Sequence, residues 1–167
     1  MFNALEKSLA AEGYTATPIT PDNFPKAYEV YAANQPFFLL TDGQETTPET
    51  SRNDLTALPP NCTPDQKLYF TIQKDNHPLA VCDIILNFPE KQTFWLGLLL
   101  IHATHQNQSL GSHFLSHILQ AAKISGYITA QLGVIDINTR AAAFWQKHGF
   151  TIQRQSGNIV VMTRNLV

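Results

Sequence analysis

The run from Phe94 to Ile101 constrains the fold of this chain more than any other segment. It reads Phe-Trp-Leu-Gly-Leu-Leu-Leu-Ile and contains no polar side chain. A strand that is apolar at every position is covered on both faces, as in sheets that carry helices on both sides. The run leads into a polar loop at Gln106–Gly111, which opens a helical pattern. The sequence therefore predicts an α/β fold with a mixed central sheet and helices on both faces.

The rest of the chain gives an ordered set of elements. Thr47 followed by Pro48 is typical of a helix start, and Pro59 with Pro60 must follow the end of that helix. Residues 74–78, Lys-Asp-Asn-His-Pro, are typical of a hairpin turn between two strands. A short apolar run at 37–40 follows the interruption Asn-Gln-Pro at 34–36. The predicted helices are 2–12, 21–31, 47 to before 59, 110–126 and 139–148; the predicted strands are 14–19, 67–73, 79–86, 94–101, 128–135, 150–154 and 159–163.

Length and composition limit the class of protein. With 167 residues and 44% hydrophobic side chains, the chain suits one domain, residues 1–167. No window reaches the roughly 20 apolar residues that span a bilayer, and the N-terminus lacks the apolar core of a signal peptide. We expect a cytoplasmic protein with no membrane partner. Cys62 and Cys82 are then expected to be reduced thiols.

The charges are unevenly distributed. Residues 1–65 carry nine acidic and three basic side chains, whereas residues 66–167 carry four acidic and eight basic ones. A basic C-terminal half suits a ligand with phosphates and an acidic N-terminal half suits a cationic amine, although charges spread over a solvated surface give the same totals. No basic cluster is interleaved with aromatic residues, so we expect no nucleic-acid partner.

The loop at Gln106–Gly111 has the features of an anion site. A strand that passes through a compact loop directly into a helix points several free backbone N–H groups at one spot, where the helix dipole also favours negative charge. A pyrophosphate would fit there. The alternative is an ordinary strand-to-helix connection with polar residues.

The segment from Asp136 to Phe150 reads as a capped helix. Asn138 can accept from the first free N–H groups, and Gly149 supplies the left-handed residue that ends a helix. Ala141, Phe144 and Trp145 share one face at helical spacing. Taken alone, this segment also fits a core helix with no ligand.

Together, the two segments resemble motifs A and B of the GNAT superfamily of N-acetyltransferases, in particular a bacterial subgroup. The first follows the family pattern Gln/Arg-x-x-Gly-x-Gly/Ala at Gln106 and Gly111, with Ser109 in place of the first Gly. The second follows Asn-x-x-Ala-x-x-Phe/Leu-Tyr-x-x-x-Gly-Phe, with Trp145 in place of Tyr. The resemblance implies a three-layer GNAT-like fold and an acetyl-CoA site. The residues implied to bind coenzyme A are Leu99, Leu100, Ile101, Gln106, Asn107, Gln108, Ser109, Leu110, Gly111, Ser112, Asn138, Ala141, Phe144 and Trp145.

The two departures bear on affinity and chemistry. Ser109 would adopt a positive φ less easily than glycine, although its hydroxyl could donate to a phosphate. In many family members the Tyr at the position of Trp145 protonates the leaving thiolate, and an indole cannot do so. A thiol has a pKa of about 8.5, so the thiolate can leave unaided or with help from water.

The attacking amine must lose a proton, which requires a base. Asp83 is the first candidate, because a carboxylate within the apolar strand Val81–Ile85 is costly unless it is paired or used. It could instead point outward or bond to backbone. His102, Glu29 and Tyr31 are further candidates, and Glu29 and Tyr31, together with Asn34, are expected to contact the substrate.

The histidines are not expected to hold a metal. His113 and His117 have the four-residue spacing of a two-His site, but they lie opposite the apolar stripe of their helix with no carboxylate between them. We expect a solvated helix face there and no metal. His102 and His105 could contact a phosphate if charged, or be exposed loop residues.

The predicted reaction is direct transfer of acetyl from acetyl-CoA to a primary amine in a ternary complex. The acceptor, a cationic small molecule or a peptide, is not identified by the sequence. One alternative is a non-catalytic module that binds or senses acyl-CoA, and another is an interaction domain that has lost the cofactor. The resemblance also implies a possible homodimer.

Overall fold

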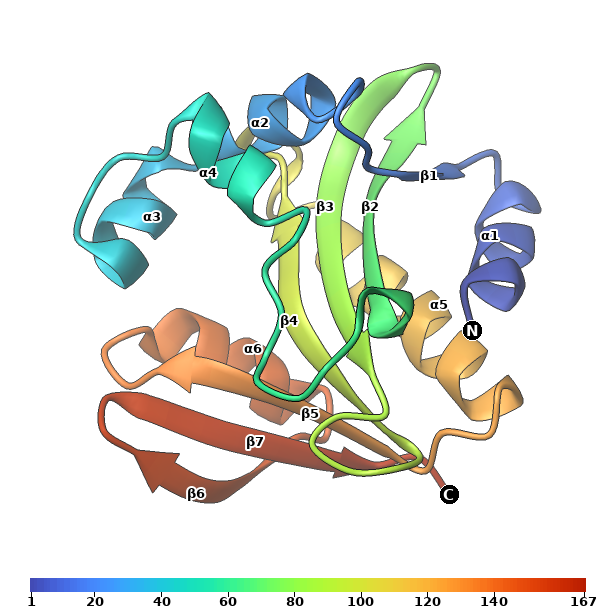
Figure 1. Cartoon of the computed structure of the whole chain (residues 1–167), viewed down its shortest axis with the longest axis vertical. Coiled ribbons are helices and arrows are strands. Elements are labelled where there is room, and N and C mark those ends of the chain that lie inside the picture. Colours follow the sequence, from blue (N-terminus) through green and yellow to red (C-terminus); the bar gives the residue numbers. More distant parts are fainter.

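A sheet of seven strands runs through the computed structural model, which describes residues 1–167 (Figure 1). The strands are β1 (Thr15–Pro18), β2 (Lys67–Lys74), β3 (His77–Leu86), β4 (Thr93–Ile101), β5 (Thr129–Ile135), β6 (Thr151–Ser156) and β7 (Ile159–Asn165). Their order in the sheet is β1-β2-β3-β4-β5-β7-β6. Every neighbouring pair is antiparallel except β4 and β5, which are parallel. The mixed sheet predicted from the sequence is confirmed.

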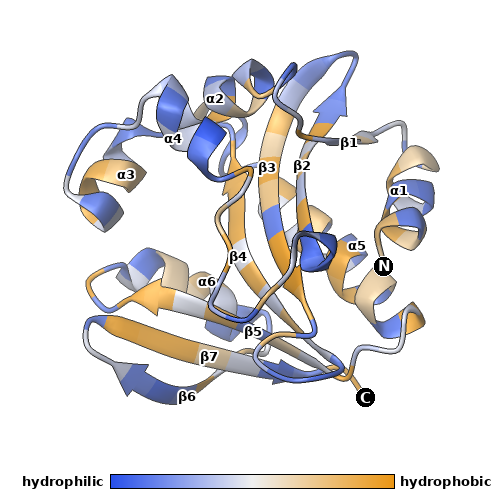
Figure 2. Cartoon of the chain, viewed as in Figure 1, coloured by the Kyte–Doolittle hydropathy of each residue, from blue (hydrophilic) through white to orange (hydrophobic).

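Helices cover both faces of the sheet. They are α1 (Phe2–Ala10), α2 (Pro25–Ala32), α3 (Gln35–Asp42), α4 (Pro48–Asn53), α5 (Leu110–Ile124) and α6 (Thr139–Lys147), with 3₁₀ turns η1 (Pro64–Gln66) and η2 (Ala103–His105). On one face, side chains of α1, α5 and α6 pack with the sheet into the larger apolar core. On the other face, α2 and α3 form a smaller core with β2, β3 and β4. Figure 2 shows the apolar colour along β3 and β4, between these two layers. No helix is both long and apolar enough to cross a membrane.

One predicted boundary in the N-terminal part is wrong, and the structure places two further segments. The helix expected from residue 21 begins at Pro25, because Asn23 Oδ1 accepts from the Thr20 N–H (2.7 Å) and holds a turn there. The apolar run at 37–40 belongs to α3, whose first turn tolerates Pro36 because that position needs no N–H donor. The helix that begins after Thr47 ends at Asn53, before the proline pair, as predicted.

The prediction that β4 is covered on both faces holds only in part. Phe94, Leu96 and Leu100 are buried, but Gly97 is exposed and Leu98 and Leu99 are half-buried. The cause lies in the sheet: β4 pairs with β5 only from Thr93 to Trp95, and the two parallel strands then separate. Beyond Trp95, β4 has no neighbouring strand on this side, and residues 96–99 border an opening.

Candidate functional site

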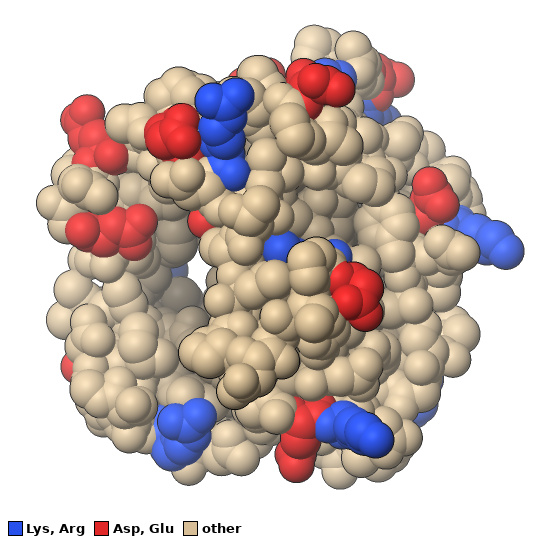
Figure 3. All heavy atoms as spheres, viewed as in Figure 1, with Lys and Arg blue, Asp and Glu red and all other residues tan.

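The separation of β4 and β5 creates a cavity of about 360 Å³. Its walls are β3, β4, β5 and α6 and, on the opposite side, α2, α3 and the end of α4. Figure 3 shows an opening through the molecule in this region, with acidic side chains along its upper rim. The residues that line the cavity are Tyr31, Phe37, Phe38, Thr41, Asp42, Asp54, Asp83, Leu96, Gly97, Leu98, Leu99, Leu132, Gly133, Val134, Ile135, Asn138, Ala141 and Trp145.

The free edge of β4 turns backbone groups toward the cavity. The His102 N–H donates to the Leu79 carbonyl (2.8 Å), which shows that residues 102 and 79 are a hydrogen-bonded pair of the two antiparallel strands β3 and β4. In an antiparallel pair the bonded residues alternate, so Leu100 bonds to β3 while the peptide groups of Leu99 and Ile101 face the other edge. Consistent with this, the Ile101 carbonyl accepts from side chains outside the sheet. The Leu99 N–H is therefore a donor directed at the gap between β4 and β5.

The loop between β4 and α5 presents a row of free backbone donors. From Asn107 to Ser112, no backbone N–H group donates to any backbone or side-chain acceptor of the protein. The last of these groups belong to the first turn of α5, a helix of 15 residues, so its dipole adds positive potential at the same place. This arrangement fits an anion with several oxygens, such as a pyrophosphate.

The loop holds this shape through left-handed backbone at two residues that are not glycine. Asn107 has φ +59° and Ser109 has φ +62°. The Ser109 side chain makes no capping hydrogen bond, so nothing within the protein compensates its strained backbone. The positive φ at Ser109 is the conformation that glycine adopts freely.

Helix α6 closes the site from the other side. The side-chain oxygen Oδ1 of Asn138 accepts from the Ala141 N–H (3.1 Å), which confirms the predicted helix cap. Arg140 donates to Asn107 Oδ1 (3.0 Å) and so connects the first turn of α6 to the loop. The Phe144 ring packs against Gly111, where an added Cβ would lie 3.5 Å from it. The two segments singled out in the sequence are thus in contact.

A buried ion pair lies beside the cavity on β3. Asp83 Oδ2 is 2.7 Å from Lys67 Nζ, while Asp83 Oδ1 is buried and has no hydrogen-bond partner. Burial raises the pKa of the Asp83 carboxyl above its ordinary value, against the lowering effect of Lys67. Asp83 also lies next to Gly97, at a bulge where the β3–β4 register shifts.

A second carboxylate, Asp54, lies in a hydrogen-bonded chain of side chains. Tyr31 Oη donates to Asp54 Oδ2 (2.6 Å), and Tyr69 Oη donates to Tyr31 Oη (3.0 Å). Burial raises the pKa of Asp54, opposed by the Tyr31 hydrogen bond and by Lys67. Burial also raises the pKa of both tyrosines, so both hydroxyls are neutral donors at physiological pH.

A sequence comparison identifies the protein family. A family model described as the acetyltransferase (GNAT) family matches residues 25–150. The chain belongs to this family. GNAT proteins are acetyl-CoA-dependent acyltransferases. The loop at Gln106–Gly111 and all residues that line the cavity lie within the matched residues. No curated protein sequence matched the chain.

Solved structures agree with the GNAT assignment. An acetyltransferase from Thermus thermophilus is 27% identical, with a TM-score of 0.80 and coverage of 91% of this chain and 96% of that one. The PaiA N-acetyltransferase from Thermoplasma acidophilum, in complex with coenzyme A, is 15% identical, with a TM-score of 0.68 and coverage of 91% and 98%. A GNAT acetyltransferase from Elizabethkingia anophelis with acetyl-CoA bound is 17% identical, with a TM-score of 0.64 and coverage of 92% and 99%.

Some residues predicted to act in this GNAT site are bonded within the protein or do not line the cavity. Asn34 is buried, and its side chain donates to the carbonyls of Val30 and Ile101 and accepts from Gln106, so its polar atoms are bonded within the protein. The Gln106 side chain is likewise bonded to the Ile101 carbonyl. Glu29 is exposed on α2 and does not line the cavity.

Two other predicted residues bond to protein groups. The Ser112 hydroxyl lies 2.8 Å from His148 Nε2, between α5 and α6. His102 Nδ1 lies 2.9 Å from Thr104 Oγ1 in the η2 turn, and His102 does not line the cavity. Of the residues expected to contact substrate, only Tyr31 lines it.

Sequence reasoning missed Asp54, Asp42 and Arg140. Asp42 and Asp54 lie at the ends of α3 and α4. The positions of these helices over the sheet depend on tertiary packing, so no local pattern in the sequence indicates that the two carboxylates reach the cavity. Arg140 does leave a signal: a basic side chain in the first turn of a helix opposes the helix dipole, which is favourable only where an anion is also present.

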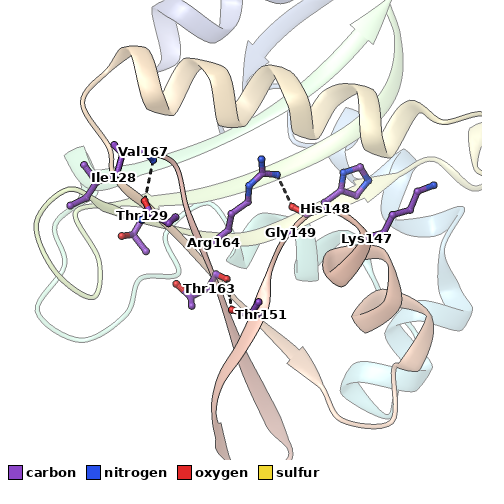
Figure 4. A pocket seen from close by; sticks show the side chains of 10 residues that line it. Ile128, Thr129, Lys147, His148, Gly149, Thr151, Thr163, Arg164 and Val167 are labelled. Carbon is purple, nitrogen blue, oxygen red and sulfur yellow. Dashed lines mark hydrogen bonds between the residues drawn. The ribbon is translucent and has the colours of Figure 1, made fainter.

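A larger and more open depression of about 790 Å³ lies behind the end of α6 (Figure 4). Three threonines, Thr129, Thr151 and Thr163, and the basic side chains of Lys147 and Arg164 are among the residues that line it. The Arg164 guanidinium donates to the His148 carbonyl (2.6 Å) and so satisfies the C-terminal end of α6. The depression contains none of the predicted site residues and none of the free N–H groups.

Proposed function

We propose that the protein transfers an acetyl group from acetyl-CoA directly to a primary amine. One observation carries the proposal: the free N–H groups from Asn107 to Ser112 lie at the end of the same strand, β4, whose free edge lines the cavity. A ligand with an extended arm attached to a pyrophosphate can therefore place the far end of that arm between β4 and β5. Acyl-CoA has such an arm, the pantetheine chain that carries the acyl group.

In this proposal the loop and α6 hold the cofactor. The N–H groups from Asn107 to Ser112 bind the pyrophosphate, and Arg140 supplies a neighbouring positive charge. The small side chain of Ala141 leaves room for the pantetheine arm. The side-chain nitrogen Nδ2 of Asn138 is available to that arm, because only the side-chain oxygen Oδ1 caps α6.

The Leu99 N–H supports the chemical step by donating to the thioester carbonyl oxygen. When the amine attacks, a C–N bond forms and negative charge develops on that oxygen, where a fixed donor is most effective. The C–S bond then breaks and the thiolate leaves. Trp145 lines the cavity but cannot supply a proton, so the thiolate leaves unaided or takes its proton from water.

Asp83 is proposed as the base that takes the proton from the amine. It lines the cavity, its Oδ1 has no protein partner, and its raised pKa makes it a stronger base than an exposed carboxylate. Asp42 and Asp54 line the same cavity, which favours a cationic acceptor over a neutral or acidic one. Neither cysteine lines the cavity, which supports direct transfer over a cysteine-bound acyl intermediate.

The test is an acetyl-CoA assay with a panel of primary amines, with release of free thiol as readout and mass spectrometry of the product. We expect N-acetylated product and intersecting initial-rate lines, as in a ternary complex, whereas parallel lines would indicate a covalent acyl-enzyme. Asp83→Asn should lower kcat about 100-fold or more with little change in affinity for coenzyme A. Asp22→Asn, on an exposed turn that does not line the cavity, is the matched control.

The second candidate is a non-catalytic acyl-CoA binding module. Trp145 favours it, because this side chain occupies the cavity wall without a titratable group. This candidate predicts that acetyl-CoA raises the melting temperature while no amine in the panel releases thiol. An absence of any thermal shift with coenzyme A would contradict both candidates.

A further inference from the structure

Three potential metal ligands converge between α1 and α5, on the face of the sheet that carries the larger core. Glu12 lies in the turn that follows α1, and His113 and His117 lie one helical turn apart on α5. Glu12 Oε2 is 2.9 Å from His113 Nε2, and Glu12 Oε1 is 3.2 Å from His117 Nε2. The expectation of a solvated face is wrong for His117, whose side chain is only 10% exposed beneath α1.

The spacing of these atoms is close to that of a zinc site. Zinc bonds to imidazole nitrogen and carboxylate oxygen are about 2.0–2.2 Å long, so neighbouring ligand atoms in a tetrahedron lie about 3.3–3.5 Å apart. One ligand atom from each of the three residues lies within 4.8 Å of the other two. Small side-chain rotations at the partly exposed His113 and Glu12 would bring all three onto one ion.

His117 is already oriented by a further contact. Its Nδ1 lies 2.5 Å from the Ser8 hydroxyl on α1. When His117 Nδ1–H donates to that oxygen, the lone pair of Nε2 is directed toward Glu12. Metal-ligating histidines are held in this way by a hydrogen bond from their other ring nitrogen, which fixes the tautomer and the ring plane.

The ligand chemistry selects the class of ion. Two imidazoles and one carboxylate suit divalent transition metals such as zinc, whereas calcium and magnesium prefer oxygen ligands. No local pattern in the sequence indicates the carboxylate, because Glu12 is about 100 residues from the histidines and reaches them only through the packing of α1 on α5.

We propose that Glu12, His113 and His117 bind one zinc-type divalent ion, which fastens α1 to α5 and leaves a fourth position for water. The site lies outside the acetyl-CoA cleft and none of its ligands lines that cavity. The ion therefore joins the N-terminal helix α1 to α5, the helix that follows the loop at Gln106–Gly111. Its existence does not depend on the proposed transferase activity.

The test uses the untagged full-length chain, stripped with a chelator and titrated with Zn²⁺ by calorimetry. We expect one ion per chain and a rise in melting temperature. Co²⁺, used as a spectroscopic probe, should give the visible absorption of a four-coordinate N/O site. Glu12→Gln and His113→Asn should each weaken Zn²⁺ binding at least tenfold, and Ser8→Ala should weaken it by about 10-fold to 100-fold.

Three matched variants control for adventitious binding. Glu6→Gln removes an exposed acid from α1, His77→Asn removes an exposed hairpin histidine, and His105→Asn breaks the other close histidine pair. These should bind Zn²⁺ with unchanged affinity. Because His113 and Glu12 are partly exposed, their variants should remain folded by circular dichroism. Absent or substoichiometric binding, or equal affinity in Glu12→Gln, His113→Asn and the wild type, would overturn the proposal.

Discussion

Lys67 Nζ and Asp83 Oδ2 lie 2.7 Å apart, with side chains only 5% and 18% exposed, on neighbouring strands at the wall of the cleft. Lys67 also donates to the Ala57 carbonyl (2.9 Å), so the ammonium is held from two sides. Lys67 favours the ionised form of a carboxyl group in a place where burial favours its neutral form.

Removal of the cation should therefore be more damaging than removal of both charges. We predict that Lys67→Met lowers the free energy of unfolding by about 3–5 kcal/mol, because Asp83 is left buried and unpaired. The double variant Lys67→Met with Asp83→Leu should recover most of that loss. Urea unfolding followed by fluorescence measures both. Equal stability of the single and double variants would show that the carboxylate is adequately solvated without Lys67.

Asp54 predicts how stability changes with pH. Its folded-state pKa is raised above the ordinary 3.8, so it contributes stability that is fully present below that value and is lost as the pH rises through the raised pKa. Asp54→Asn has no such loss and can still accept from Tyr31. We predict that the melting temperature of Asp54→Asn, relative to wild type, increases between about pH 3.5 and pH 7. The exposed Asp22→Asn should show no such increase; a flat difference for Asp54→Asn would contradict the burial effect.

Ser109→Gly should stabilise the loop at Gln106–Gly111, which is proposed to bind the pyrophosphate. A serine with φ +62° carries a conformational penalty of about 1 kcal/mol that glycine avoids, and part of this gain is offset by the greater freedom of glycine in the unfolded chain. We predict a gain of about 0.5 kcal/mol in unfolding free energy and tighter binding of coenzyme A. Ser109→Ala is the control, because it removes the hydroxyl but keeps the strain. If Ser109→Ala binds coenzyme A as tightly as Ser109→Gly, backbone strain is not what limits affinity.

Features that depend on neighbouring residues could be predicted from the sequence, and features that depend on distant ones could not. The strand Phe94–Ile101, the cap at Asn138 and the helix end at Gly149 were predictable, because apolar period and capping are local. The bonds that occupy Asn34 were not, since they depend on Ile101 and Gln106, distant in the chain.

The carboxylates of the cleft show the same limit. Asp83 could be singled out because a charge inside an apolar strand is a local anomaly. Asp54 lies in a polar segment and is distinguished only by the hydrogen-bonded chain that connects it to Tyr31 and Tyr69. The gap between β4 and β5 is likewise a property of the sheet and not of either strand.

Trp145→Tyr tests whether departure of the thiolate limits the reaction. Trp145 lines the cavity and packs on Phe144 and Phe150, with ring centroids 4.9 Å and 5.5 Å apart, so an aromatic replacement keeps the main contacts. A tyrosine hydroxyl can protonate the leaving sulfur, which the indole cannot, and we predict a rise in kcat of about tenfold. Trp145→Phe is the matched control, because it leaves a similar void without a hydroxyl. Steady-state rates with a saturating amine measure the effect, and equal kcat for the Tyr and Phe variants would mean that sulfur protonation does not limit the rate in this cleft.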